Sequence, residues 1–247
     1  MNTRNKSFLL LAAILVVAAA IAGIAANGQS ALAAGGGSKT NGIVFDKNNF
    51  SNSLNINNNY FPLKSGTTFT YKGTSDGTPT KDVVVVTGKT KDILGVTARV
   101  VHDTVYENGK AVEVTDDWYA QDNSGNVWYL GESTKDLESG STEGSWEAGV
   151  NGAKPGIIME ANPQVGDTYY QEFLNGVAED QATVIQLDAS VCVPYGCFDN
   201  NVLVTKEFTA LEPGVVDHKY YAPGVGDIKE ETVQGGNEIL ELVNIKI

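Results

Sequence analysis

Apolar and polar residues alternate with a period of two along most of the chain beyond residue 60. The runs that show this pattern are rich in Val, Thr, Tyr and Ile, and they cover 68–71, 82–87, 112–120, 127–129, 182–187, 202–208 and 239–247. Because successive side chains of a strand point to opposite faces, the pattern is typical of β-strands with one buried face. No segment beyond residue 34 repeats its apolar residues with a helical period. The pattern predicts about ten to twelve strands.

Dipeptides that tolerate a positive φ separate these runs. They are Asp76-Gly77, Asn108-Gly109, Ser124-Gly125, Asn175-Gly176 and Gly235-Gly236. Such dipeptides favour tight hairpins between neighbouring strands. We therefore expect an all-β protein whose antiparallel meander forms a barrel-like or curved-sheet domain.

Three landmarks recur along the chain at a nearly constant separation. The separations are 101, 101 and 102 residues, and the pairs are Pro62 and Pro163, Gly95 and Gly196, and Tyr119 and Tyr221. The recurrence predicts an internal duplication, with halves at about 60–131 and 161–247 and an insertion at 132–160. Gly and Pro are common in β proteins, so a chance recurrence is the alternative. Two small meanders could each cover the open apolar face of the other.

The first 34 residues have the three parts of a secretory signal. Arg4 and Lys6 precede 19 apolar or small residues at 8–26, and an Ala-Leu-Ala site follows at 31–33. This order predicts a signal-peptide helix that is cleaved after residue 33 or 34. An uncleaved anchor is the alternative, because 19 helical residues span roughly 28 Å, close to the thickness of a bilayer core. Residues 35–59 are rich in Gly, Ser and Asn and are expected to form a spacer before a single β domain at 60–247.

The charge of the chain excludes some partners. It has 17 basic and 30 acidic residues. Residues 1–34 contain two bases and no acid, so the remainder has 15 bases and 30 acids, a net charge of −15. So acidic a surface repels phosphate backbones, and nucleic acid is not expected as a partner. We expect a secreted or extracytoplasmic, surface-associated protein that meets a membrane only through its N-terminal segment, if that segment is uncleaved.

Cys192 and Cys197 are the two cysteines, and turn residues lie between them. In an oxidising compartment such a close pair predicts a disulfide across a tight turn. A metal site is the alternative. The two histidines, His102 and His218, lie far away in sequence and have no ligand spacing, so we expect no metal and no cofactor.

No catalytic residues can be assigned from the sequence. The neighbours His102 and Asp103 resemble a base with its orienting carboxylate, but adjacent strand residues point to opposite faces. Residues 122–126 resemble the start of a calcium loop, yet position twelve is Ser133 rather than Glu. A hairpin turn is the better interpretation of that segment. Enzymatic activity is therefore uncertain, and a non-enzymatic role is favoured.

Aromatic residues are the better candidates for ligand contacts, because aromatic side chains on a β surface can bind sugars or line an apolar cavity. Cross-strand core pairs are the alternative interpretation of the same residues. The candidates are Trp118, Tyr119, Trp128, Trp146, Met159 and Tyr221.

Four strings resemble those of a family of uncharacterised exported all-β proteins. They are YFPLKSGTTF at 60–69, DWYAQDNSGNVWY at 117–129, PGIIM at 155–159 and HKYYAPGVG at 218–226. This resemblance implies no established activity, so it assigns no functional residue. The last string is also loosely similar to the C-terminal strands of curved-sheet lipoprotein-carrier proteins. That similarity implies a carrier for an apolar ligand.

The sequence thus leaves three functional hypotheses. The first is a non-enzymatic binding or carrier module for an apolar or small ligand. The second is a structural cell-envelope protein without a ligand, which would contact an envelope component. The third and weakest is a secreted hydrolase.

Overall fold

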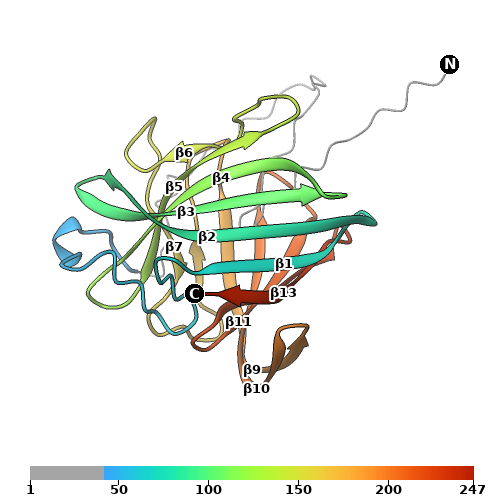
Figure 1. Cartoon of the computed structure of the whole chain (residues 1–247). Coiled ribbons are helices and arrows are strands. Elements are labelled where there is room, and N and C mark those ends of the chain that lie inside the picture. The colour runs from blue at the N-terminus through green and yellow to red at the C-terminus, as the bar shows by residue number, and fades with distance from the viewer. Residues whose placement is uncertain (1–41) are drawn as a thin grey trace, which may run out of the picture.

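The computed structural model describes residues 42–247, in which thirteen strands form one antiparallel sheet (Figure 1). A single 3-10 turn at Lys47–Asn49 is the one helical element in this range. The strands, in chain order, are β1 (Thr68–Ser75), β2 (Thr78–Ile93), β3 (Val96–Glu107), β4 (Lys110–Gln121), β5 (Val127–Asp136), β6 (Trp146–Glu147), β7 (Gly156–Met159), β8 (Thr168–Tyr170), β9 (Asp180–Val193), β10 (Gly196–Thr209), β11 (Val216–Ala222), β12 (Gly226–Gln234) and β13 (Ile239–Lys246).

The sheet consists of two successive meanders. Its order is β6-β5-β4-β3-β2-β1-β13-β12-β11-β10-β9-β8, and the pairing of β1 with β13 joins the first meander (β1–β5) to the second (β9–β13). β9, β10 and β11 lie behind the strands of the first meander and cross them steeply, whereas β13 runs beside β1 (Figure 1). The predicted all-β, curved antiparallel fold is confirmed.

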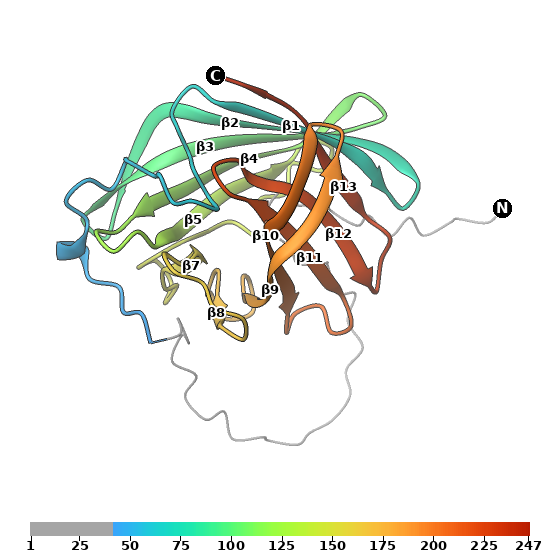
Figure 2. The same ribbon diagram turned by 90° about the horizontal axis from the view of Figure 1, so that it is seen from below.

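The two ends of the sheet approach each other without closing. β7 pairs with β5, and a single bridge joins Lys154 to Phe173 just beyond β8. Figure 2 shows β7 and β8 side by side below the two meanders. The buried residues of both meanders form one core on the concave side of the sheet, as expected when one twisted sheet covers itself. The Ile157, Ile158 and Met159 side chains of β7 complete this core.

The predicted turn residues take the backbone conformations that hairpins require. Asp76 and Gly77 have φ values of 48° and 77° between β1 and β2. Asn108 and Gly109 have φ values of 49° and 82° between β3 and β4. Two successive positive φ values are the feature of the tight hairpin that Asp-Gly and Asn-Gly favour.

Part of the segment expected to be a spacer packs against the strands. Phe45 and Phe50 pack against Trp128 with ring centroids 5.2 and 6.2 Å away. Ile56 is buried, and the Ser53 hydroxyl donates to the Thr97 carbonyl over 2.6 Å. The Asn-rich composition obscured these few apolar anchors.

The predicted signal segment, 1–34, lies outside the described residues. Between 42 and 247 no helix is long and apolar enough to cross a membrane.

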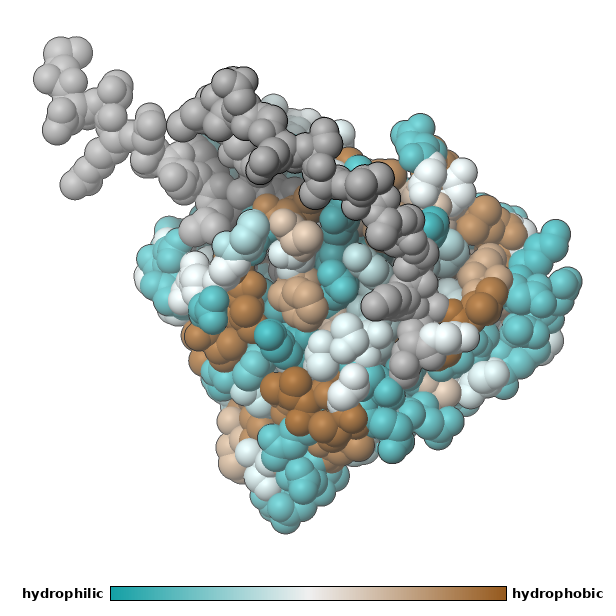
Figure 3. All heavy atoms as spheres, turned by 180° about the vertical axis from the view of Figure 1, so that it is seen from behind, coloured by the Kyte–Doolittle hydropathy of each residue, from teal (hydrophilic) through white to brown (hydrophobic). Residues whose placement is uncertain are grey.

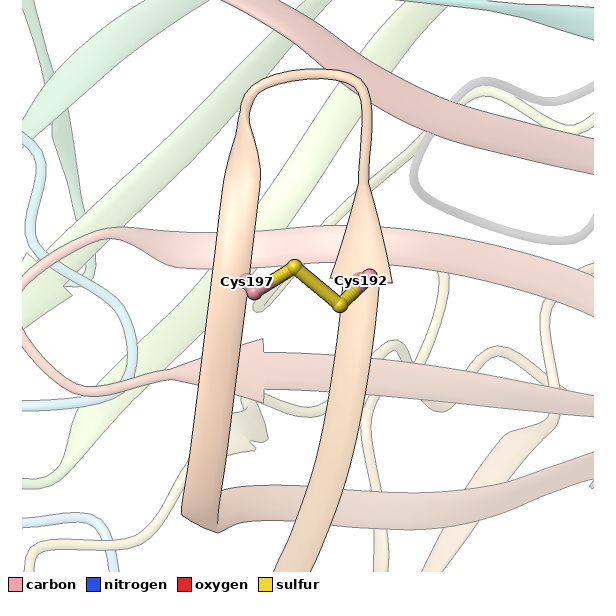
Figure 4. Close-up of a disulfide and its surroundings, with 2 residues drawn as sticks. All are labelled: Cys192 and Cys197. Carbon is pink, nitrogen blue, oxygen red and sulfur yellow. A yellow bond between two sulfur atoms is a disulfide. The ribbon is translucent and has the colours of Figure 1, made fainter.

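The predicted disulfide is confirmed. Cys192 and Cys197 face each other across the β9–β10 hairpin with their Cα atoms 4.1 Å apart (Figure 4).

The outer surface carries both apolar and hydrophilic side chains. On the face in Figure 3, apolar side chains form separate patches among hydrophilic ones.

Candidate functional site

The concave face of the sheet carries a layer of acidic side chains. Such burial is unusual, because a carboxylate away from water needs a counter-charge or a proton. The buried acids of the first meander are Asp82, Asp103, Glu113, Asp117 and Glu132, and those of β9–β12 are Asp180, Glu207, Asp217, Asp227 and Glu230.

Asp82 and Asp103 form a proton-sharing pair in the first meander. Each is 1% exposed. Burial raises the pKa of Asp82 to about 6, and burial together with the Asp82 charge raises the pKa of Asp103 well above its usual range. No donor among the described residues reaches either oxygen of Asp103. The two carboxyls therefore share a hydrogen bond only when one of them is protonated.

Tyr129 links the next two acids. Its hydroxyl lies 2.8 Å from Asp117 Oδ1 and 2.6 Å from Glu132 Oε2. Burial raises the pKa of Glu132 to about 8. Burial and the neighbouring Glu132 charge raise the pKa of Asp117. A carboxyl that keeps its proton near neutral pH can donate that proton to an oxygen of a bound molecule.

A buried ammonium group organises the second meander. Lys219 is fully buried, and its Nζ lies 3.3 Å from Glu207 Oε2 and 3.5 Å from Glu230 Oε2. Burial alone would lower the pKa of Lys219, but the charges of Glu207 and Glu230 outweigh burial and raise it. The other oxygen of Glu207 accepts hydrogen bonds from Gln171, Thr205 and Tyr221 over 3.0, 2.8 and 3.3 Å.

The strand register places the residues of the two meanders in corresponding positions. Asp103 pairs with Val84, as Glu207 pairs with Ala182. Asp117 pairs with Glu132, as Lys219 pairs with Glu230. A register shift follows each of the last two pairs, before Tyr119 in one meander and before Tyr221 in the other. Lys219 therefore occupies the place of Asp117, and Glu207 the place of Asp103.

A surface cleft of about 640 Å³ opens where β4, β5 and β6 meet. Trp118 and Trp146 supply aromatic surface, and Asp116, Glu132 and Glu147 supply carboxyl groups. Glu132 belongs both to this cleft and to the acidic layer, because it lines the cleft and pairs with Asp117.

Lys91 crosses the cleft. Its Nζ lies 2.7 Å from Glu147 Oε2 and 3.2 Å from the centroid of the Trp118 ring. Ser133 and Asn151 add polar groups to the same lining. The cleft thus combines aromatic surface with hydrogen-bonding groups, which suits a small ligand with both an apolar and a polar side.

The structure brings two of the six aromatic and apolar candidates to the cleft, namely Trp118 and Trp146. Tyr119 and Tyr221 lie on the concave face on either side of Phe61. Trp128 is buried beneath Phe45 and Phe50, and Met159 is buried in β7. A role of any of these residues in ligand binding stays a prediction.

Two expectations about chemistry can be placed on the structure. His102 and Asp103 do point to opposite faces, and His102 Nδ1 contacts Asp116 Oδ1 of the next strand at 2.7 Å. The loop at 122–126 is a hairpin turn, because the Asp122 side chain accepts hydrogen bonds from the Ser124 and Asn126 backbone amides. Among the described residues, no three His, Cys, Asp or Glu side chains are placed to hold a metal ion.

Sequence reasoning missed Lys219 and the acidic layer. A signal was present, because Asp82, Val84 and Val86 alternate on one face of a strand, so an acid interrupts an apolar stripe. Lys219 follows Asp217 and His218 and precedes two tyrosines, so in the sequence it looks like an ordinary surface lysine. Its partners come from β10 and β12, which the sequence alone does not align.

Comparison with known proteins finds a likeness to a solved structure. No family model matches the chain, and no curated protein matches it. A crystal structure described as a "putative lipoprotein" from Parabacteroides distasonis shares 16% sequence identity with the chain. The alignment covers 76% of this chain and 99% of that protein, with a TM-score of 0.46.

Proposed function

We propose that the protein is an exported, non-enzymatic binding module that holds a small ligand in the cleft between β4, β5 and β6. One observation carries the proposal: two tryptophans from different strands and several polar groups converge on one cleft of about 640 Å³. This volume lies within the range typical of small-molecule sites. The disulfide between Cys192 and Cys197 supports export, because such bonds persist in oxidising compartments.

The mixed lining favours an amphiphilic ligand over a purely apolar one. Trp118 and Trp146 offer ring surface, while Ser133 and the carboxyl groups offer hydrogen-bonding partners. Lys91 already places an ammonium over Trp118, so a ligand would either displace Lys91 or use its charge. We expect a ligand with one apolar face and several hydrogen-bonding groups.

Native mass spectrometry of the protein purified gently from its own host tests the proposal. A reproducible extra mass that leaves on denaturation would support it and would identify the class of ligand. A bare mass for the protein and for both variants described below would contradict it and favour a structural role in the cell envelope.

A pair of variants on β5 locates the ligand. Ser133 and Lys135 are both exposed, but Ser133 lines the cleft and Lys135 does not. Ser133→Trp fills the cleft and should reduce ligand retention at least about tenfold, the effect of losing about 1.4 kcal/mol of binding. Lys135→Trp adds the same indole outside the cleft and should retain the ligand. Equal retention by both variants would place the ligand elsewhere.

A further inference from the structure

The two meanders differ most where the second one places its buried ammonium. Lys219 Nζ lies between Glu207 and Glu230 and provides the counter-charge of that face. At the corresponding register the first meander has Asp117. Among residues 42–247, none of the ion pairs includes an acid on the concave face of β2–β5.

The polar atoms around Asp117 lack the partners that their counterparts have. Both oxygens of Asp103 and the Tyr119 hydroxyl are buried. Among the described residues only the carboxyl of Asp82 reaches Asp103, by sharing a proton, and no donor or acceptor reaches the Tyr119 hydroxyl. Their counterparts are satisfied, because Glu207 accepts from Tyr221 over 3.3 Å and pairs with Lys219. Buried polar atoms without partners are uncommon and call for an explanation.

We propose that the concave face of the first meander binds an ammonium group between Asp103, Asp117 and Tyr119, in the position that Lys219 Nζ takes in the second. An ammonium carries three donors and no acceptor, which suits two carboxylates and a hydroxyl oxygen. A metal ion suits the position less well, since the described residues do not place three ligating side chains around one point. The site is separate from the cleft and does not depend on a ligand bound there.

Glu132 provides a route to this position. Its side chain lines the cleft, and it lies directly opposite Asp117 in the β4–β5 pairing. The strongly negative chain attracts cations to its surface. Glu132 therefore joins the lining of the cleft to the acids next to this position.

The groups that surround the position are mostly acids. They act on one another across several strands. The titratable side chains that act on Asp103, Asp117 or Tyr119 are Tyr71 of β1, Asp82 of β2, Glu113 and Asp116 of β4, Tyr129 and Glu132 of β5, and Glu172 next to β8.

Thermal unfolding of the purified protein in different chloride salts tests the proposal. At pH 8 and one ionic strength, ammonium or methylammonium should raise Tm by about 2–4 °C over tetramethylammonium, which has no N–H donor. At pH 5 the difference should shrink, because protonated carboxyls no longer attract a cation. Equal Tm values in all three salts at pH 8 would overturn the proposal.

Three substitutions make the test specific to the site. Asp103→Asn should abolish the ammonium effect, whereas Asp199→Asn, at an exposed position of the distant β9–β10 hairpin, should keep it. Asp117→Lys supplies the ammonium from the chain itself and should also remove the response to added ammonium. If Asp117→Lys fails to fold, the Asp103→Asn and Asp199→Asn pair still decides, and a full response in Asp103→Asn would overturn the proposal.

Discussion

The two meanders share a hydrogen-bonding register but have different charges on their concave faces. In the second, Lys219 neutralises Glu207 and Glu230. In the first, Asp117 takes the corresponding place, and among the described residues only the carboxyl of Asp82 reaches Asp103. The hydrogen-bonding register of the strands therefore does not depend on how the buried acids are neutralised. One face uses a cation of the chain itself, and the other requires protons or an external cation.

The comparison also bears on the predicted duplication, which stays a prediction. Tyr119 and Tyr221 occupy corresponding register positions, each after a register shift. Gly95 and Gly196 take neighbouring rather than identical places, since Ile93 pairs with Val96 and Val193 with Gly196. This shared register supports an origin by duplication followed by divergence of the buried charges.

Removing the ammonium of the second meander should have the largest effect. Lys219→Met leaves Glu207 and Glu230 buried without their cation, and such a loss costs about 3–5 kcal/mol of unfolding free energy. Denaturant unfolding at pH 7 measures it. Lys206→Met, which removes an exposed lysine of β10, should cost less than about 0.5 kcal/mol. Similar values for both variants would mean that Lys219 is not the organising cation.

The acids of the first meander should make the protein less stable at high pH. Their folded-state pKa values are raised, to about 6 for Asp82 and to about 8 for Glu113 and Glu132, mainly by burial. Unfolded carboxyls titrate near pH 4, so the folded protein holds more protons above that pH. The stabilisation is therefore complete below about pH 4 and is lost as the pH rises through the folded-state values, about 6 to about 8.

Tm measured from pH 5 to pH 9 in a buffer without amines checks this expectation. Each raised pKa unit corresponds to about 1.4 kcal/mol, so the total loss should reach a few kcal/mol. Asp103→Asn should flatten the profile because it removes one titrating member of the pair. A Tm that rises steadily toward pH 9 would contradict the assignment of protons to this face.

The two corresponding hairpins are held in different ways, which gives a smaller test. A disulfide links Cys192 to Cys197 near the tip of the β9–β10 hairpin. Replacing both cysteines with Ser should cost about 2 kcal/mol, because the closed loop is short. A reductant should lower the stability of the unmodified protein by the same amount and leave the variant unchanged. An unchanged protein in reductant, with the bond shown to be open, would contradict this role.

The β2–β3 hairpin is held instead by the N-terminal segment. The Ser53 hydroxyl donates to the Thr97 carbonyl over 2.6 Å. Ser53→Ala should therefore cost about 1 kcal/mol, the value of one partly buried hydrogen bond. Ser51→Ala removes an exposed contact with Asn123 and should cost less, as measured by denaturant unfolding. A larger loss for Ser51→Ala would assign the anchoring role to the exposed contact.

The sequence by itself determined the fold class, the hairpins and the disulfide. These features depend on neighbours in the chain: alternation sets the two faces of a strand, Asp-Gly and Asn-Gly set the turns, and Cys197 follows Cys192 closely. Local composition does not reveal how residues 43–59 pack, because Phe45, Phe50 and Ile56 are anchors only in the presence of Trp128 and the core.

Only the tertiary structure decided how the acids are arranged and where the cleft lies. Whether a carboxyl is solvated, paired or protonated depends on strands that are distant in sequence, as Lys219 shows with partners on β10 and β12. The cleft likewise arises where the short strand β6 meets β5 and brings Trp146 close to Trp118. The alternation of apolar and polar residues and the residues that favour turns act over a few positions of the chain. Burial and charge balance depend on the packing of the whole sheet.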